Sequence, residues 1–228
     1  MSAESFQRDW ERRFGRPEPK VLCVGLNYHA HSNEVGTELP KAPLLFAKFA
    51  STLVRDGDAI VLPDGLGHVD SEAELAIVIG ALAKDVSTDD AYEYIAGFTC
   101  ANDVSARDVQ FGDGQWFRGK GYDTFCPVGP RIVPPDEIGD AGNLRIQQRL
   151  NGEILQDSRT SRLIFGLPEL VAYASHVLTL LPGDLILTGT PEGCGAFRDP
   201  KISMAPGDVV EIEIDAIGIL RNEVRAAG

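Results

Sequence analysis

The sequence has no long apolar run and few basic residues. No apolar stretch reaches the ~18 residues that a membrane-spanning helix needs. Lysine and arginine number 21 against 34 acidic residues, so the formal net charge is −13, which does not favour nucleic acid or an anionic membrane as a partner. The N-terminal stretch MSAESFQRDWERRF is charged and lacks the apolar core of a signal peptide, so we predict a cytoplasmic protein.

Cysteine is also scarce, and the four cysteines lie far apart. No C-x-x-C pattern joins Cys23, Cys100, Cys126 and Cys194, which predicts free thiols in a reducing compartment and neither a disulfide framework nor a structural zinc site. No cysteine has a histidine close by in the sequence to activate it. The Gly-x-Ser-x-Gly motif and the Gly-Lys-Ser/Thr ending of a phosphate loop are missing as well. The sequence therefore favours neither acyl-enzyme chemistry nor a nucleotide site.

Short strands and turns dominate what is present. The chain has 228 residues, of which 43% are hydrophobic, and this composition suits one large soluble domain with an ample core. Gly-Asp turns lead into apolar β-formers at 57–61, 183–187 and 207–211, and Asn151-Gly152 predicts a hairpin. With no alternating β-α rhythm, the pattern predicts a mainly β (α+β) fold, a roll or barrel with few helices.

Three helices are predicted. An aromatic stripe at helical spacing indicates a helix over 5–14, which prolines then end, so we divide the chain into an N-terminal helical appendage, 1–19, and a main domain, 20–228. A capping threonine predicts a helix over 89–96. A leading proline and an apolar stripe predict another over 168–181.

Two glutamates on one predicted strand form the first candidate site. The alternation of residues 69–79 predicts a strand in which Glu72 and Glu74 share a face, about 7 Å apart. A solvated edge face is the alternative, but the apolar continuation LAIVIG favours a buried position. Asp103 follows another apolar stretch, as a ligand at a strand end would. Hard oxygen ligands on rigid strands favour Mg²⁺ or Mn²⁺.

Candidate anion-binding groups follow Asp103 in the sequence. Arg107 and Gln110 are three residues apart and would share a face of a helical turn, where they could bind one anionic group. A turn capped by Asp103 and an Arg107–Asp108 ion pair are the structural alternatives. Lys120 lies between two glycines that permit close approach of a ligand, and a surface loop lysine is its alternative.

A histidine and a glutamate near the start form a candidate general base. His31 and Glu34 have the i, i+3 spacing that lets a carboxylate orient an imidazole. His29 adds a His-x-His pattern of the kind found in cupins, but the second half of the cupin pattern is missing. Further along, Thr190 lies in a Gly-rich turn whose backbone amides could bind a carboxylate.

Taken together, these segments resemble the fumarylacetoacetate hydrolase family. The matching stretches, in the family's order over about residues 20–215, are VGLNYHAHSNE, the E-A-E strand, NDVSARDVQ, RGKGYDTFCPVGP, NGEILQDSRTSRLIF and GDLILTGTPEGCG. The resemblance is nearest to the short, single-domain branch. That branch contains acylpyruvate hydrolases, 2-hydroxyhepta-2,4-diene-1,7-dioate isomerases and oxaloacetate decarboxylases.

The resemblance implies a fold, an assembly and a set of roles. It implies a mixed β-sandwich roll, a homodimer and a small anionic 2-oxo acid as substrate. It implies Mg²⁺ (or Mn²⁺) held by Glu72, Glu74 and Asp103. The other implied roles are a water-activating dyad on a mobile lid (His31, Glu34), a lysine beside the reacting carbonyl (Lys120), and substrate-binding or nearby residues (Arg107, Gln110, Thr190, Lys48).

Hydrolysis of a C–C bond in a 2,4-dioxo acid, such as an acylpyruvate, is the activity that the sequence favours. The polar neighbours Ser32 and Asn33 suggest that the dyad holds water and not an apolar C–H group. A 2-hydroxyhepta-2,4-diene-1,7-dioate (5-carboxymethyl-2-hydroxymuconate-type) isomerase and an oxaloacetate decarboxylase are the enzymatic alternatives. A metal-stabilised binding protein is the non-enzymatic one, and the intact set His31, Glu34 and Lys120 argues against it.

Overall fold

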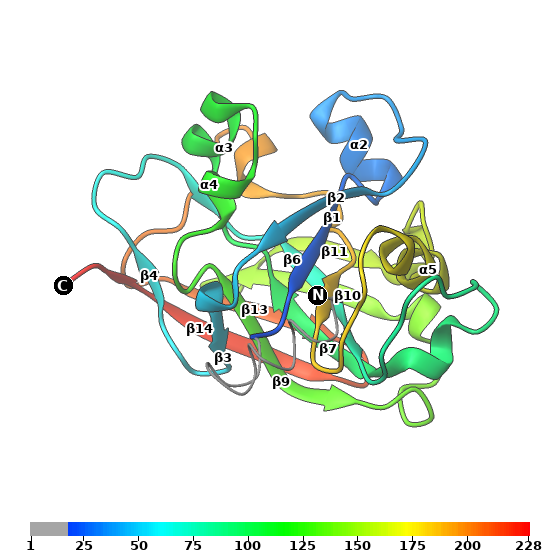
Figure 1. Ribbon diagram of the computed structural model, residues 1–228. Helices are drawn as coiled ribbons and strands as arrows, with labels where there is room; N and C mark the ends of the chain where they lie inside the picture. Colours follow the sequence, from blue (N-terminus) through cyan, green and yellow to red (C-terminus); the bar gives the residue numbers. More distant parts are fainter. Residues whose placement is uncertain (1–17) are drawn as a thin grey trace, which may run out of the picture.

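The computed structural model describes residues 18–228 (Figure 1). Of the predicted N-terminal helical appendage, residues 1–17 lie outside the described residues. Within the described part, no helix is long and apolar enough to cross a membrane.

Two sheets form the body of the protein (Figure 1). The larger sheet has seven strands in the order β2 (Leu44–Lys48), β1 (Val21–Gly25), β12 (Leu185–Leu187), β6 (Ala73–Ile79), β7 (Ile95–Asn102), β9 (Cys126–Val133) and β3 (Leu53–Arg55). Strand β1 pairs in parallel with β12, and β3 pairs in parallel with β9, whereas the other pairs are antiparallel. The sheet is therefore mixed.

The second sheet has five strands. Their order is β11 (Glu153–Arg159), β10 (Arg145–Leu150), β13 (Val209–Ile214), β14 (Gly218–Ala226) and β4 (Ile60–Leu62). The predicted hairpin is confirmed, because β10 and β11 pair around Asn151 and Gly152, both with positive φ as a tight hairpin turn requires. A separate two-stranded ladder joins β5 (Val69–Asp70) to β8 (Ser105–Ala106).

The main core lies between the two sheets. Leu75 and Ile77 from β6 pack into one cluster with Ile146 from β10 and Ile212 from β13, and each side chain is at most 1% exposed. Side chains of the opposite face of β6 belong to a second buried cluster. Strand β6 is thus buried on both faces, and the alternative of a solvated edge is wrong. The predicted mainly β roll with few helices is confirmed.

The predicted single strand over 69–79 is divided in the structure. Val69–Asp70 pairs with β8, and the ladder of β6 begins only at Ala73. Side chains replace ladder bonds at the interruption: the amide of Glu72 donates to Asn102 Oδ1 at 3.0 Å, and that of Ala73 to Gln156 Oε1 at 2.9 Å. Glu72 therefore lies just outside the regular strand.

The helices are short and lie outside the sheets. They are α2 (His29–Val35), α3 (Arg107–Asp113), α4 (Phe117–Lys120) and α5 (Leu167–Val177). Single 3-10 turns occur as η1 (Ala50–Thr52), η2 (Ala91–Tyr94), η3 (Ala141–Asn143), η4 (Thr160–Arg162) and η5 (Gly195–Phe197).

One predicted helix is too long and another is wrong. Helix α5 has the expected proline in its first turn but ends at Val177, because Leu178 is extended (φ −150°) and Leu180 bridges to Ala83. The helix predicted over 89–96 is only the turn η2, since Ile95 already begins β7. Pairing with β6 in the buried sheet outweighs the weak local helix preference.

Candidate active site

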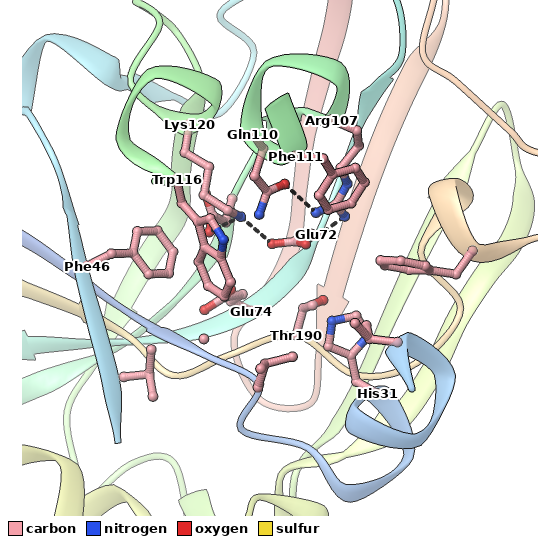
Figure 2. Close-up of a pocket in the computed structure, with 16 residues that line it drawn as sticks. His31, Phe46, Glu72, Glu74, Arg107, Gln110, Phe111, Trp116, Lys120 and Thr190 are labelled. Carbon is pink, nitrogen blue, oxygen red and sulfur yellow. Dashed lines mark hydrogen bonds and ion pairs between the residues drawn. The ribbon is translucent and has the colours of Figure 1, made fainter. Parts of the chain in front are cut away.

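The predicted site residues meet in one pocket of about 430 Å³, its open mouth included (Figure 2). Arg107, Gln110 and Lys120 reach it from helices α3 and α4, and His31 reaches it from α2 (Figure 2). Eight of the predicted residues line it: His31, Glu72, Glu74, Asp103, Arg107, Gln110, Lys120 and Thr190. The other two, Glu34 and Lys48, lie behind the lining and contact it through His31 and Asp103.

Three carboxylates converge on the floor of the pocket. Glu72 precedes β6, Glu74 belongs to it, and Asp103 follows β7. The antiparallel register pairs Ala73 with Asn102, so all three side chains lie at the same end of the sheet. One oxygen from each carboxylate lies within 4.8 Å of the others, and all three residues are buried.

Two buried lysines neutralise part of this charge. Lys120 Nζ donates to Glu72 Oε2 at 2.8 Å, to Asp103 Oδ2 at 2.7 Å and to Ser105 Oγ at 2.8 Å. Lys48 Nζ donates to Asp103 Oδ1 and to the carbonyl of Val104. Because Lys120 is only 2% exposed, the alternative of a surface loop lysine is wrong. Burial opposes the charged form of Lys120, but Asp103 and Glu72 outweigh it and raise its pKa.

The carboxylates differ in how well they are compensated. Burial raises the pKa of Glu72, but Arg107 and Lys120 outweigh this effect and hold the pKa well below its usual range. Among the described residues, Glu74 accepts one hydrogen bond, from the amide of Gly189 at 2.6 Å. Burial and the nearby Asp103 and Glu72 raise the pKa of Glu74 well above its ordinary value. The charge of Glu74 is therefore the least compensated of the three.

The donor set fits a divalent cation. Three carboxylates on rigid backbone offer only hard oxygen ligands, and Glu74 has no cationic partner among the described residues. Glu72, Glu74 and Asp103 would therefore hold Mg²⁺ or Mn²⁺, as the sequence predicts.

Arg107 is held on the same wall by an acid that sequence reasoning did not assign. Its Nε and Nη2 donate to Asp70 Oδ2 at 3.1 and 2.8 Å, and Nη2 also donates to Glu72 Oε1 at 2.6 Å. Its Nη1 donates to Gln110 Oε1 at 3.0 Å, so the expected convergence on α3 is present. The alternative pairing with Asp108 is wrong, because Asp108 accepts from the amide of His68.

Asp70 joins two walls of the pocket. Besides Arg107, its carboxylate accepts from the amides of Gly195 at 2.9 Å and Ala196 at 3.0 Å, at the start of η5. Phe197, in the same turn, lies 5.5 Å from the Arg107 guanidinium and packs edge-on against His31 at 5.7 Å. Nothing local in the sequence distinguishes Asp70 from the other acids, because its partners, apart from the adjacent amide of Ser71, lie 37 and 125 or more positions away.

We expect Asp70→Asn to destabilise the fold and to weaken binding of an anionic substrate. The change leaves the buried Arg107 with a single acidic partner, and breaking a buried ion pair typically costs about 3–5 kcal/mol. Urea unfolding measures the stability, and KM measures substrate binding. Asp64→Asn, at an exposed position in the loop before β5, is the matched control. Equal stability of the two variants would contradict the role of Asp70.

The histidine and glutamate of α2 form the predicted pair. His31 Nδ1 lies 3.0 Å from Glu34 Oε2, and Glu34 Oε1 accepts from the amide of Gly193 at 2.9 Å. With Glu34 ionised, Nδ1 carries the proton of a neutral imidazole, which leaves the lone pair on Nε2. The preceding segment is anchored by Asn27, whose amide nitrogen donates to the carbonyls of Thr188 and Phe165.

Thr190 closes the pocket between these walls. Its hydroxyl accepts from Gln156 Nε2 at 2.9 Å, and the backbone turns sharply just before it. Gly189 has φ +102°, and a Cβ there would lie 2.8 Å from the Cβ of Asn27. The Gly-Thr pair therefore lets the loop pass close to the start of α2.

Four aromatic side chains complete the lining, and sequence reasoning identified none of them. They are Phe46, Phe111, Trp116 and Phe197. Phe46 and Trp116 pack edge to face at 5.2 Å, and Phe46 also lies 5.2 Å from Lys120 Nζ. These residues come from β2, α3, the residue before α4 and η5, so no sequence spacing connects them.

Comparison with known proteins agrees with this architecture. Residues 20–225 match the family model described as fumarylacetoacetate (FAA) hydrolase C-terminal. The chain belongs to the fumarylacetoacetate hydrolase family, as its motifs predict.

The relatives that resemble it include tautomerases and isomerases. The rat protein named "Oxaloacetate tautomerase Fahd2a, mitochondrial" is 48% identical over 92% of this chain and 67% of its own length. An uncharacterized protein of Methanocaldococcus jannaschii is 50% identical over 90% of this chain and 83% of its own. The rat relative's name places that protein in mitochondria, and the cytoplasmic location of this chain stays a prediction.

Two solved structures resemble the fold closely. The 5-carboxymethyl-2-hydroxymuconate delta-isomerase from Mycobacterium smegmatis has a TM-score of 0.83 and 45% identity, covering 92% of this chain and 80% of its own. The 2-hydroxyhepta-2,4-diene-1,7-dioate isomerase from Mycobacterium marinum has a TM-score of 0.82 and 45% identity, covering 92% and 76%.

Proposed function

We propose that the protein is a metal-dependent isomerase that transfers a proton between the enol and keto forms of a short 2-oxo acid such as oxaloacetate. The observation that carries the proposal is the position of the His31–Glu34 pair in the same small pocket as the carboxylates Glu72, Glu74 and Asp103. The names of the relatives support the choice, because tautomerases and isomerases both move a proton without consuming water.

The metal site and the polar residues of α3 would both contribute to binding of the substrate. A divalent cation on Glu72, Glu74 and Asp103 would bind the carboxylate and keto oxygens of a 2-oxo acid and stabilise negative charge on the keto oxygen. Arg107 and Gln110, side by side on α3, present polar groups to the same space. Buried Lys120 keeps that end of the pocket from carrying the full charge of the carboxylates.

His31 would move the proton. Glu34 holds Nδ1, so Nε2 of the neutral imidazole accepts the proton from the carbon next to the keto group and delivers it to the resulting enolate oxygen; the same two transfers in reverse convert the enol to the keto form. The net reaction moves one proton between that carbon and the keto oxygen. Water is neither consumed nor released.

The surroundings of His31 favour proton transfer at carbon over activation of water. Ser32 and Asn33 are polar neighbours of the dyad in the sequence, as activation of water would require. However, Ser32 is buried with its hydroxyl donating to the carbonyl of Leu26, and Asn33 is exposed. Neither lines the pocket, because successive residues of a helix point in different directions. Two residues that do line it near His31 are apolar: Val35, one turn further along α2, and Phe197, whose ring packs edge-on against the imidazole.

Hydrolysis of a 2,4-dioxo acid is the second candidate, and one experiment separates the two. The enzyme with Mg²⁺ is given enol-oxaloacetate, whose ketonisation is followed by the loss of enol absorbance, and separately an acylpyruvate in ¹⁸O-water. We expect accelerated ketonisation and no ¹⁸O in the carboxyl group of any acid released from the acylpyruvate. Labelled acid together with an unchanged rate of ketonisation would overturn the proposal in favour of hydrolysis.

A further inference from the structure

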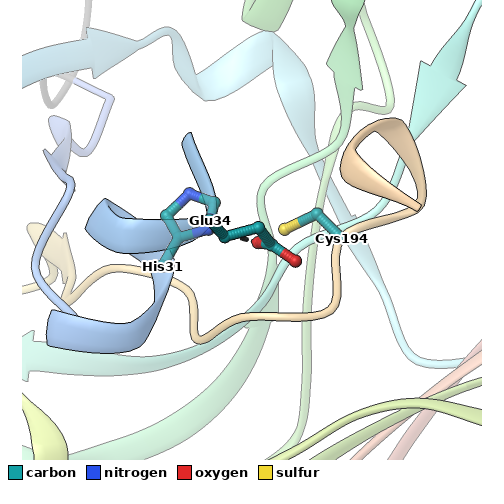
Figure 3. Close-up of side chains that lie close together, drawn as sticks. All are labelled: His31, Glu34 and Cys194. Atoms are coloured by element: carbon teal, nitrogen blue, oxygen red, sulfur yellow. Dashed lines mark hydrogen bonds and ion pairs between the residues drawn. The ribbon is translucent and has the colours of Figure 1, made fainter. Parts of the chain in front are cut away.

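A buried cysteine lies beside the proposed catalytic pair. His31, Glu34 and Cys194 each offer a ligand atom within 4.8 Å of the other two (Figure 3). Cys194 directly precedes η5, more than 150 positions away from α2 in the sequence. Among the described residues, the other three cysteines lie in no such cluster, although all four are buried and free.

The three side chains are held in place by the protein itself. The amide of Gly193 donates to Glu34 at 2.9 Å, which ties the residue before Cys194 to the dyad. Gln156 Nε2 lies 3.5 Å from the Cys194 sulfur, and Glu34 keeps 19% of its side chain exposed. Hydrogen bonds within the protein therefore position the cluster, and the side chain of Glu34 is partly exposed.

The donor set differs in kind from that of the carboxylate site. A thiolate, an imidazole and a carboxylate are the ligands that Zn²⁺ takes, and three protein ligands leave a fourth tetrahedral position for water. Glu72, Glu74 and Asp103 offer only oxygen, which suits Mg²⁺ or Mn²⁺. The two clusters should therefore discriminate between soft and hard divalent ions.

We infer that His31, Glu34 and Cys194 form a second metal site, which binds Zn²⁺ or a similarly soft divalent ion and thereby inhibits the enzyme. On binding, the thiol releases its proton to solvent and the ion takes His31 Nδ1. The proton of the neutral imidazole then moves to Nε2. The nitrogen that accepts protons in the proposed reaction no longer has a free lone pair. The binding site stands independently of the proposed function, whereas the inhibition rests on it.

Cobalt provides a spectroscopic test of the binding site. Co²⁺ is titrated into the full-length protein saturated with Mg²⁺, and absorbance is recorded in the region of thiolate-to-cobalt charge transfer. The all-oxygen site cannot produce such a band. We expect the band in the wild type and in Cys100→Ala, which changes a buried cysteine outside this cluster. We expect it to be lost in Cys194→Ser and Cys194→Ala. Calorimetric binding of Mg²⁺ confirms that each variant is folded.

Inhibition is measured on the same proteins. We expect Zn²⁺ to inhibit the wild type at least about 10-fold more strongly than Cys194→Ser, because one of three ligands is lost. A wild type without the cobalt band, a band that persists without Cys194, or equal inhibition of both proteins would overturn the inference. If the band behaves as expected but oxaloacetate is not a substrate, the metal site stands and the proposed function falls.

Discussion

Glutamine in place of Glu74 is expected to remove Mg²⁺ binding from the protein. The substitution keeps the size of the side chain and deletes the one carboxylate of the three that has no cationic partner among the described residues. Loss of residues that only support a metal ligand costs about 10–100-fold in affinity, so loss of a ligand should cost at least about 100-fold. Calorimetric titration of chelator-treated protein measures the change.

The titration also has a predicted pH dependence. Because burial and nearby carboxylates raise the pKa of Glu74, a proton competes with the cation at this position. Affinity of the wild type should therefore fall as the pH falls. Glu153→Gln, on the exposed part of β11, is the matched control and should bind Mg²⁺ like the wild type. Equal affinities of Glu74→Gln and the control would place the metal elsewhere.

Alanine in place of His31 is expected to lower kcat on the order of 100-fold or more without changing Mg²⁺ affinity. His31 is the proton acceptor of the proposed mechanism, and removal of a general base typically has this effect. Glu34→Gln should act in the same direction, since it removes the charge that keeps the proton on Nδ1. Ketonisation of enol-oxaloacetate measures the rate, and calorimetry measures the affinity.

The same helix supplies the control for this prediction. His29 is exposed on α2, two residues from His31, so His29→Ala should retain wild-type turnover. Release of CO₂ from oxaloacetate needs charge stabilisation but no base, so any decarboxylation should survive in His31→Ala. Loss of Mg²⁺ binding in His31→Ala would mean that the histidine is a ligand of the metal, and the division of roles would be wrong.

The parts of the site that could be predicted from the sequence depend on short spacings. Glu72 and Glu74 are two positions apart at the start of β6, and one helical turn brings His31 to Glu34. Turn motifs such as Asn151-Gly152 can also be predicted, because a tight hairpin turn requires positive φ and these residue types adopt it readily.

The parts that could not be predicted depend on contacts between distant segments. The sequence does not distinguish Asp70 from the other acidic residues, and only the fold brings Arg107 and the start of η5 to it. Cys194 had no histidine near it in sequence, but the fold brings His31 within reach. The direction of the Ser32 side chain depends on the fold in the same way, because its hydroxyl donates to the carbonyl of Leu26 and does not enter the pocket.

The two buried lysines determine whether the protein needs its cation in order to fold. A zinc finger does not fold without its metal, because metal binding supplies the free energy of folding that its small core cannot supply. Here Lys48 and Lys120 already neutralise part of the carboxylate charge, and the core lies elsewhere, between the two sheets. We therefore expect the chain to fold as an apoprotein. In the proposed metal-dependent enzyme, the cation would then enter and leave a folded molecule, and the supply of free cation would set the active fraction.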